Sequence, residues 1–476
     1  MEGQNIENTT LKDLGSNNKM KTANTGKILF DGNAFNLRQH SPEVAILTFD
    51  LKGERVNKFD GNVFEDLENC LEIIEKSSKL KALLIRSAKQ NSFIVGADIN
   101  LIQSMKDKEE ATAAAAGGQK IFNRLEDLSV KTLVAIEGPC MGGGTEFSLA
   151  CDYRVCSDHA KTVIAVPEVK LGILPGWGGT YRLPKTVGLM NALEMITSGK
   201  NIRAKKAPKI GLADLLVPHE NFENLSIQLA EELAKTGTLK GKKSRKVPFA
   251  EKLLTSNPIG RSVFYSKAKK MILKQSKGHY PSPLKSLELL KKYSGKNRDA
   301  YLEQEAKAFG ELWATEESKN LVRLFFLMED NKKNLGDVKL TKDEIKKIEK
   351  IEQLSVLGAG TMGGGIAYSS SKAGLFVLLK DIAMEAVGKG LAHAQKLISK
   401  EASRRRINKT EAGNRMARIK GQIDYVGFKG SDLVVEAVVE NLEIKKKVFS
   451  ELEKHVREDC VLASNTSTLR LNDIAS

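Results

Sequence analysis

Short apolar runs alternate with helix-like segments along the chain up to about Leu189. Four of these runs are rich in Val, Ile and Leu and are bounded by polar residues or glycine, which is typical of buried β-strands. We predict strands over 44–49, 82–85, 132–136 and 162–166. Residues 63–78 instead place their apolar side chains at helical spacing, on one face. This alternation predicts an α/β domain built of packed layers.

After Leu189 the apolar positions recur mainly at helical spacing, and the pattern stays helical through Met328. Residues 331–350 are polar and rich in lysine, which indicates a linker, and a second strand–helix unit begins at Gln353. We therefore predict four segments: a disordered extension over 1–27, an α/β core over 28–225, a basic helical segment and linker over 226–350, and a second α/β domain over 351–476.

The composition is that of a folded protein, because 41% of the 476 residues are hydrophobic and 28% are charged. No apolar run approaches the ~18 residues that a membrane-spanning helix needs, so we expect no integral membrane segment. The five cysteines include no Cys-x-x-Cys pair, which argues against a disulfide framework and a zinc module. We expect no metal site and a reducing, cytoplasmic location.

The net charge of +16 is concentrated in one stretch, because residues 231–300 contain 18 Lys and Arg against 5 Asp and Glu. Such a stretch can bind nucleic acid, an anionic membrane surface or a phosphorylated ligand, or it can be a solvated helical surface. No zinc-finger spacing or aromatic-rich RNA-binding pattern accompanies it, so we expect no nucleic acid as a partner.

A glycine-rich turn in residues 133–146 follows a predicted strand and opens a predicted helix at Gly142, Gly143 and Gly144. Glycine lets the backbone approach a ligand closely, and a helix N-terminus presents unpaired N–H groups with a partial positive charge. Such a turn can stabilise an oxyanion, and Glu146 in the first helical turn would face the same ligand.

A second glycine turn, at Gly96, follows an earlier strand and could supply another N–H group to the same anion. A second carboxylate, Glu168, comes directly after the strand predicted at 162–166. Two carboxylates beside one anion site can add water across a double bond, one as general base toward water and the other as proton donor. Each feature alone is common, because glycine turns often precede helices and a loop glutamate is usually solvated.

Three strings occur in an order and spacing that resemble the crotonase (enoyl-CoA hydratase/isomerase) superfamily: Phe93-Ile-Val-Gly-Ala-Asp-Ile99, Gly142-Gly-Gly-Thr-Glu146 and Pro167-Glu-Val-Lys-Leu-Gly-Ile-Leu-Pro-Gly-Trp-Gly-Gly-Thr180. The resemblance implies a ββα spiral that binds acyl-CoA. It implies that the N–H groups of Ala97 and Gly143 form the oxyanion hole and that Glu146 and Glu168 are the catalytic pair. Because both carboxylates are present, it favours hydration of trans-2-enoyl-CoA, with isomerisation of a 3-enoyl double bond as a side activity.

The second α/β domain opens with a dinucleotide fingerprint. The apolar run 353–357 precedes Gly358-Ala-Gly360-Thr-Met-Gly363, a helix-like segment follows, and Asp381 ends the next strand. Gly358 would make the tight turn, Gly360 would admit the pyrophosphate, Gly363 would allow close helix packing, and Asp381 would bind the ribose hydroxyls. Because a carboxylate repels a 2′-phosphate, we predict NAD as cofactor; a structural βαβ unit without a ligand is the alternative.

Residues 433–445 and 463–467 resemble 3-hydroxyacyl-CoA dehydrogenase. The resemblance implies a Rossmann-type NAD-binding domain in which the cofactor and the adjacent substrate path are lined by Met362, Val438, Val439, Glu440, Lys445 and Ser467. It also implies that Asp330, at the end of a connecting helix, touches substrate. That family has a catalytic His and a helical domain further on, and the sequence ends at Ser476 before both, so we expect negligible dehydrogenase turnover.

A crotonase-like ββα spiral followed by a helical linker and a Rossmann-type domain is the layout of multifunctional β-oxidation enzymes. This resemblance implies acyl-CoA substrates, a thiolase subunit as partner and an oligomeric assembly. The basic segment would then meet the phosphates of coenzyme A or border a channel for the acyl-CoA. Two alternatives stay open at this point: a binding subunit without useful turnover, and an inactive fragment.

Overall fold

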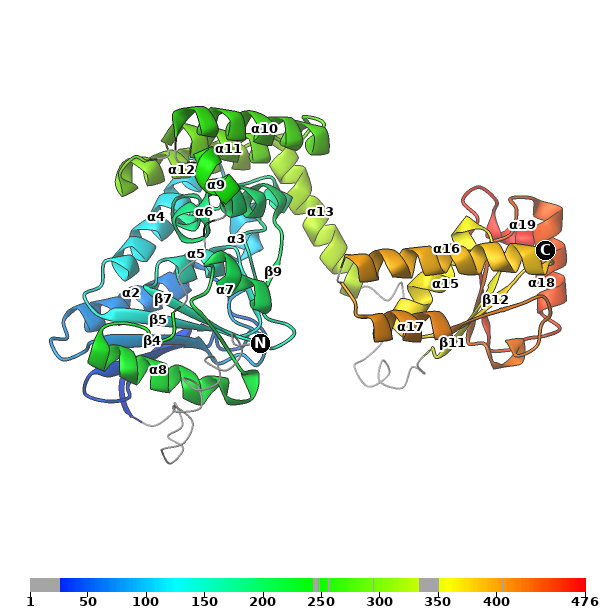
Figure 1. The fold of residues 1–476 in the computed structure, drawn as a ribbon, viewed down its shortest axis with the longest axis horizontal. Helices are drawn as coiled ribbons and strands as arrows, with labels where there is room; N and C mark the ends of the chain where they lie inside the picture. The colour runs from blue at the N-terminus through cyan, green and yellow to red at the C-terminus, as the bar shows by residue number, and fades with distance from the viewer. Residues whose placement is uncertain are drawn as a thin grey trace. The chain divides into compact units, whose positions relative to one another are not determined.

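The computed structural model describes residues 26–242, 247, 249–255, 257–293, 295–333, 351–404 and 406–476. It divides the chain into two compact units, Met1–Asn334 and Leu335–Ser476 (Figure 1). The predictions of a disordered extension over 1–27 and of a linker over 331–350 fall almost entirely outside the described residues.

The first unit is built on a seven-stranded sheet with the strand order β1-β2-β3-β4-β5-β7-β10. The antiparallel ladder β1-β2-β3 forms one edge, and the pairs from β3 to β10 are parallel. The strands of this sheet are β1 (Lys27–Asp31), β2 (Phe35–Gln39), β3 (Val44–Phe49), β4 (Ala82–Ser87), β5 (Lys131–Ile136), β7 (Tyr153–Ser157) and β10 (Leu215–Val217). A small second sheet contains β6 (Pro139–Met141), β8 (Val163–Ala165) and β9 (Ile202–Arg203).

Helices α2 (Gly61–Glu75) and α8 (Phe222–Thr236) lie on opposite faces of the seven-stranded sheet. The other helices of this unit are α3 (Ile99–Ser104), α4 (Lys108–Glu126), α5 (Gly143–Leu149), η1 (Glu168–Leu171), α6 (Gly179–Ser198), α7 (Ala207–Ile210), α9 (Phe249–Thr255), α10 (Pro258–Ser276), α11 (Pro281–Tyr293), α12 (Arg298–Trp313) and α13 (Glu316–Lys333). Alternate residues of the parallel strands are buried on opposite faces, as in a sheet covered on both sides. Ile46, Leu84 and Leu133 pack against α8, while Leu47, Ile85 and Val134 join α2 in the other core (Figure 1).

The four strands predicted from the sequence are confirmed as β3, β4, β5 and β8, and the predicted helix over 63–78 is α2. The Asp60 side chain caps α2 by accepting the N–H of Val63 at 2.9 Å. The region after Leu189 is mostly helical as predicted, and the two short strands β9 and β10 are the elements that this prediction missed. Both strands are only two or three residues long, so their sheet partners rather than a local pattern define them.

The helices of the basic segment belong to the same compact unit as the sheet. Tyr301, Phe309 and Leu312 of α12 share a buried cluster with Ala111 of α4 and Ile173 beyond η1. The inner side of α12 is therefore part of the core of this unit.

The second unit has a five-stranded parallel sheet with the order β13-β12-β11-β14-β15. Its elements are β11 (Gln353–Leu357), α15 (Thr361–Ala373), β12 (Phe376–Lys380), α16 (Met384–Ser403), α17 (Lys409–Ala417), β13 (Ile419–Gln422), β14 (Leu433–Glu436), α18 (Leu442–Leu452), β15 (Val461–Ser464) and α19 (Leu471–Ala475). In chain order this is the 3-2-1-4-5 arrangement of a Rossmann-type domain, which confirms the predicted fold.

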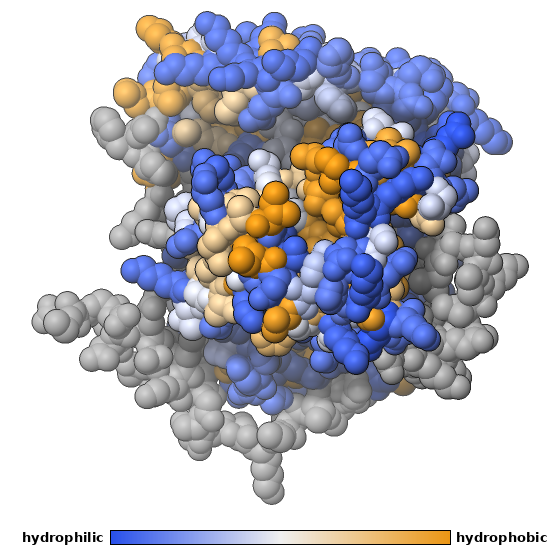
Figure 2. All heavy atoms as spheres, turned by 90° about the vertical axis from the view of Figure 1, so that its right-hand side faces the viewer, coloured by the Kyte–Doolittle hydropathy of each residue, from blue (hydrophilic) through white to orange (hydrophobic). Residues whose placement is uncertain are grey.

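Several apolar side chains of this second unit are exposed, among them Ile382, Val426 and Leu471. Figure 2 shows a face of the molecule on which apolar side chains gather in patches between hydrophilic ones.

Across the described residues, no helix combines the length and the apolar composition that crossing a bilayer requires.

Candidate active site

The turn at Gly142 joins the segments that carry the two predicted carboxylates. Gly142 has φ +52° and ψ −125°, a conformation that favours glycine, and it directly precedes α5. Its N–H donates to the carbonyl of Ala165 at 2.9 Å, and the Thr145 hydroxyl donates to the same oxygen at 2.7 Å. These bonds hold the start of α5 against the end of β8. Glu168 follows three residues after Ala165, the last residue of β8.

Glu146 is almost fully buried in the first turn of α5, at 2% exposure. Its Oε1 accepts the backbone N–H groups of Trp177 and Gly179, each at 2.8 Å. A Cβ atom added to Gly179 would lie 2.8 Å from that oxygen and 2.7 Å from the Pro175 Cβ, so a side chain there would displace the carboxylate or the proline ring. The Glu146 carboxylate is therefore held by two backbone donors at the start of α6.

Glu168 begins η1 and points its carboxylate to the same turn. A Cβ atom added to Gly142 would lie 3.0 Å from Glu168 Oε1. The other oxygen, Oε2, is shielded from solvent and accepts no hydrogen bond from any described residue. The structure therefore brings Glu146 and Glu168 together around Gly142 and leaves one carboxylate oxygen without a protein partner.

The two predicted oxyanion donors lie on neighbouring segments. Phe59 donates its N–H to the Gly96 carbonyl and accepts the N–H of Asp98, both at 2.9 Å. Because this bridge uses the residues on either side of Ala97, the Ala97 N–H points away from Phe59. The Cβ position of Gly96 lies 3.7 Å from the nitrogen of Gly143, whose N–H is the first of α5 and has no partner within the helix.

An aromatic wall closes this site on one side. A Cβ atom added to Gly143 would lie 2.2 Å from the Trp177 ring, so the indole packs directly on the turn. The indole in turn packs on Phe59, Phe64 and Phe122, with ring centroids 5.2–5.8 Å apart. An apolar wall of this kind removes water from the carboxylates beside it.

Burial raises the pKa of both carboxyl groups. For Glu146 the pKa lies well above its ordinary value, first because of desolvation and then because of the charges of Glu168 and Glu305; the Gly179 and Trp177 N–H groups oppose this shift. For Glu168, desolvation is again the main cause and raises the pKa to about 8, with a further increase from Glu305. Together the two groups therefore retain a proton near neutral pH.

Sequence reasoning missed a third buried carboxylate, Glu305 of α12, which is 0% exposed. It accepts the N–H groups of Gly178 at 2.6 Å and Thr180 at 2.9 Å. A signal was available, because Glu305 is four residues from both Tyr301 and Phe309 and therefore lies on the apolar face of its helix.

Asp330 lies at the far end of α13 from the carboxylate pair. Ser318, near the start of this helix, donates its hydroxyl to the Leu171 carbonyl at 2.8 Å, beside Glu168. Twelve residues of helix separate Ser318 from Asp330, a rise of about 18 Å. Asp330 is exposed, and its predicted contact with substrate stays a prediction.

The glycine fingerprint of the second unit forms the predicted turn between β11 and α15. Gly358 has φ +98°, and a Cβ atom on Gly363 would lie 1.8 Å from the Gly358 carbonyl oxygen. Apart from its chain neighbours, no described residue has an atom within 4 Å of the Cβ position of Gly360, so this side of the glycine is open. Asp381 follows β12 and accepts the N–H groups of Ala359 and Ile382, each at 2.7 Å. This geometry fits a dinucleotide whose pyrophosphate approaches Gly360.

Most of the other predicted cofactor residues lie at or near the surface of the second unit, whereas Lys445 is buried. Met362, Val439 and Ser467 are exposed beside the fingerprint strands, and Val438 donates its N–H to Glu436 at 2.7 Å. The Glu440 carboxylate accepts the hydroxyls of two threonines, Thr466 and Thr468.

Lys445 differs from this exposed group because it is 1% exposed. Its ammonium lies 2.7 Å from Glu436 and 3.2 Å from Glu440. A contact between Lys445 and a cofactor would require rearrangement of these pairs. Glu436, fully buried, is a residue that sequence reasoning did not single out.

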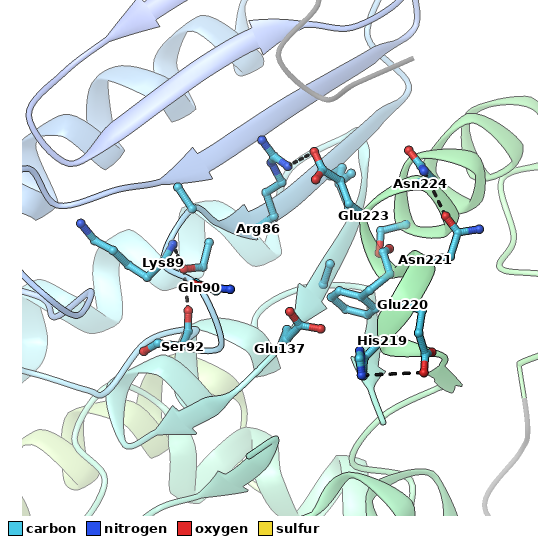
Figure 3. A pocket seen from close by; sticks show the side chains of 16 residues that line it. Arg86, Lys89, Gln90, Ser92, Glu137, His219, Glu220, Asn221, Glu223 and Asn224 are labelled. Atoms are coloured by element: carbon cyan, nitrogen blue, oxygen red, sulfur yellow. Dashed lines mark hydrogen bonds and ion pairs between the residues drawn. The ribbon is translucent and has the colours of Figure 1, made fainter. Parts of the chain in front are cut away.

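A cavity of about 510 Å³ lies elsewhere in the first unit, between the ends of β4 and β5 and the start of α8 (Figure 3). Its polar lining includes Arg86, Lys89, Glu137 and His219, with Arg86 paired to Glu223 at 2.5 Å. The described residues that line it include neither Glu146 nor Glu168, so this cavity is separate from the carboxylate site.

Comparisons with known proteins agree with the geometry of both units. A family model described as enoyl-CoA hydratase/isomerase matches residues 40–281. A second, described as the NAD binding domain of 3-hydroxyacyl-CoA dehydrogenase, matches residues 353–476.

Similar curated proteins are named fatty acid oxidation complex subunit alpha. The one from Shewanella amazonensis is 38% identical over 443 residues, which cover 93% of this chain and 61% of the relative. The one from Aliivibrio fischeri is 39% identical over 444 residues, covering 93% and 62%. The chain thus spans about three fifths of the length of these relatives. A solved enoyl-CoA hydratase from Bacillus anthracis is 24% identical, with a TM-score of 0.40, over 64% of this chain and 99% of its own.

Proposed function

The chain belongs to the enoyl-CoA hydratase/isomerase family, and from that premise we propose that its first unit hydrates trans-2-enoyl-CoA to 3-hydroxyacyl-CoA in fatty acid β-oxidation. One observation carries the proposal: the buried Glu146 and the half-buried Glu168, whose Oε2 is shielded from solvent, lie around a turn that also presents the Gly143 N–H. This arrangement can hold a water molecule and a thioester at the same time.

The reaction needs one base, one acid and one anion site. A carboxylate removes a proton from water, the water oxygen forms a bond with C3 of the enoyl group, and the electron pair of the double bond moves toward the thioester oxygen. The N–H groups of Ala97 and Gly143 would stabilise the charge that develops on that oxygen. A protonated carboxyl then delivers its proton to C2, so that the elements of one water molecule have been added.

The hydrogen bonds favour different forms of the two carboxyl groups. Glu146 accepts two backbone N–H groups, which stabilise the ionised form and suit it to act as the base. Glu168 has an oxygen that no described protein donor contacts, so this group lacks the donors that stabilise ionised Glu146 and is suited to hold the proton. We therefore assign the base to Glu146 and the acid to Glu168.

For the second unit we propose NAD binding at the fingerprint turn. Gly360 would let the pyrophosphate approach the start of α15, and Asp381 would bind the adenosine ribose. Met362, Val439, Glu440 and Ser467 would border the bound molecule. Bound NAD would supply a hydride acceptor. A thiolase partner and an oligomeric state stay predictions, which size-exclusion chromatography with a purified thiolase can test.

The decisive test is the loss of enoyl-thioester absorbance when the chain is mixed with a short trans-2-enoyl-CoA. We expect hydration, and we expect Glu146→Gln to lower kcat by ~10²–10⁴-fold because it removes the base. Glu109→Gln, at an exposed position in the first turn of α4, is the matched control and should keep the wild-type rate.

Two outcomes would count against the proposal. A folded wild-type chain that leaves the absorbance unchanged would reject hydration, and a Glu146→Gln variant with normal turnover would reject the assigned base.

A further inference from the structure

Four consecutive backbone N–H groups at the start of α6 donate in alternation to two buried carboxylates. Residues 176–180, which we call the Trp177 turn, supply these donors. The N–H groups of Trp177 and Gly179 donate to Glu146. Those of Gly178 and Thr180 donate to Glu305. Each carboxylate therefore occupies one side of the same turn.

The Glu305 carboxylate has a full set of donors in this arrangement. Oε1 accepts the side-chain amide of Gln119 at 3.1 Å as well as the Gly178 N–H, and Oε2 accepts the Thr180 hydroxyl as well as its N–H. An ionised carboxylate offers about four acceptor positions, and four donors occupy them here. The carboxylate is thus matched to this turn and has no acceptor position left for a water molecule.

The helix that carries Glu305 contacts the Trp177 turn at a second point. The Tyr301 hydroxyl, one helical turn before Glu305, donates to the Thr180 carbonyl at 3.2 Å. Gln119 also donates to the carbonyls of Gly176 and Leu302, which joins the turn to α4 and α12. From the opposite side, the Arg182 guanidinium donates to the Trp177 carbonyl at 3.0 Å.

We propose that Glu305 is a positioning residue for the hydration reaction: by accepting the N–H groups of Gly178 and Thr180, it fixes the Trp177 turn whose other two N–H groups orient Glu146. This inference rests on the proposed function for its catalytic part. Its geometric part, the link from Glu305 through the turn to Glu146, stands on the hydrogen bonds alone.

Glu305 can influence the position of Glu146 because the N–H groups that donate to the two carboxylates belong to successive residues. Successive peptide groups are joined rigidly, so a shift of the Gly178 N–H moves the Trp177 and Gly179 N–H groups with it. A displacement of about 1 Å at a catalytic group can lower a rate by ~10²-fold. In Glu305→Gln, an amide NH₂ would replace one carboxylate oxygen and would face donors with another donor.

The test compares Glu305→Gln with Glu303→Gln in steady-state hydration of a short trans-2-enoyl-CoA. Glu303 lies on the same helix, and its side chain is exposed and paired with Lys307. We expect Glu305→Gln to lower kcat by ~10–100-fold with KM within about threefold of the wild-type value, because Glu146 is misplaced while the acyl-CoA contacts remain. Glu303→Gln should keep both constants.

A second readout does not depend on activity. Hydrogen exchange of the Trp177 and Gly179 amides should accelerate in Glu305→Gln and stay unchanged in Glu303→Gln, because loosening the turn weakens both bonds to Glu146. If Glu305→Gln does not fold, Thr180→Val provides the same comparison. That variant removes one donor to Glu305 and should lower kcat by a smaller factor of ~3–10.

The outcomes separate the two proposals. Wild-type kcat and unchanged amide exchange in folded Glu305→Gln or Thr180→Val would overturn the positioning role while hydration stands. A loss that appears only in KM would also overturn it. A wild-type chain without hydration would reject the proposed function, and faster amide exchange in Glu305→Gln would then still support the geometric link.

Discussion

At the scale of single residues, the carboxylate pair explains how one site can hold both an acid and a base. Burial raises the pKa of Glu146 and Glu168, and the charge of Glu168 opposes ionisation of Glu146. The pair therefore passes through a state with one proton over a range around neutral pH, and only that state offers a base and an acid together.

This state predicts a bell-shaped dependence of hydration on pH. Below the first apparent pKa both groups are protonated and no base exists; above the second both are ionised and no acid exists. Because burial moves both values upward, we expect kcat/KM to peak near neutral pH and to fall on the alkaline side, where the pair loses its remaining proton. Rates measured from about pH 5 to about pH 10 test this. A rate that stays constant through the alkaline range would contradict it.

At the scale of elements, the glycines at the start of α15 have two kinds of surroundings. Gly363 packs against the Gly358 carbonyl, whereas Gly360, before the helix, and Gly365, within it, have no neighbour among the described residues at their Cβ positions. No contact in the described fold explains the glycine at Gly365. At Gly360, in contrast, the open space lies where a dinucleotide would approach.

Gly360→Ala should therefore keep the fold and weaken NAD binding. The added methyl group meets no atom of the other described residues, but it would crowd the pyrophosphate at a cost of ~1–3 kcal/mol, or roughly 5- to 150-fold in Kd. Gly365→Ala is the matched control, and it should raise the melting temperature because alanine favours helix. Calorimetric titration with NAD and thermal melts measure both effects. Equal NAD affinity in Gly360→Ala and the wild type would contradict the proposed cofactor site.

At the scale of the whole molecule, each proposed site is built from residues of one compact unit. Glu146, Glu168 and Glu305 all lie within Met1–Asn334, and the fingerprint turn and Asp381 lie within Leu335–Ser476. No step of the proposed hydration requires a residue of the second unit.

We therefore expect changes in one unit to leave the other site unaffected. Glu146→Gln should lower kcat for hydration by the same ~10²–10⁴-fold and keep the wild-type Kd for NAD, and Gly360→Ala should weaken NAD binding and keep the wild-type kcat for hydration. Effects of sites without shared partners usually add, so the double variant should show both losses at their single-variant size. A change in hydration rate in Gly360→Ala would contradict this independence.

The features that the sequence determined by itself are those that a short stretch of chain encodes. Short apolar runs predict β3, β4 and β5, and the glycine string before α15 predicts the fingerprint turn, because apolar periodicity and glycine content determine the local backbone conformation. The glycine turn also predicted Glu146 at the start of a helix, and the strand predicted at 162–166 placed Glu168 directly after its end. Loops at the ends of strands converge on one site.

Only the tertiary structure decided which distant residues complete those sites. Glu305 reaches the Trp177 turn from a helix more than a hundred residues downstream, and its place on the apolar face of α12 does not reveal which backbone donors it meets. The burial of Lys445 against Glu436 and the pairing of β10 with β7 likewise depend on packing between separate segments. Local sequence specifies elements and turns, whereas desolvation and hydrogen-bond partners arise only when those elements pack together.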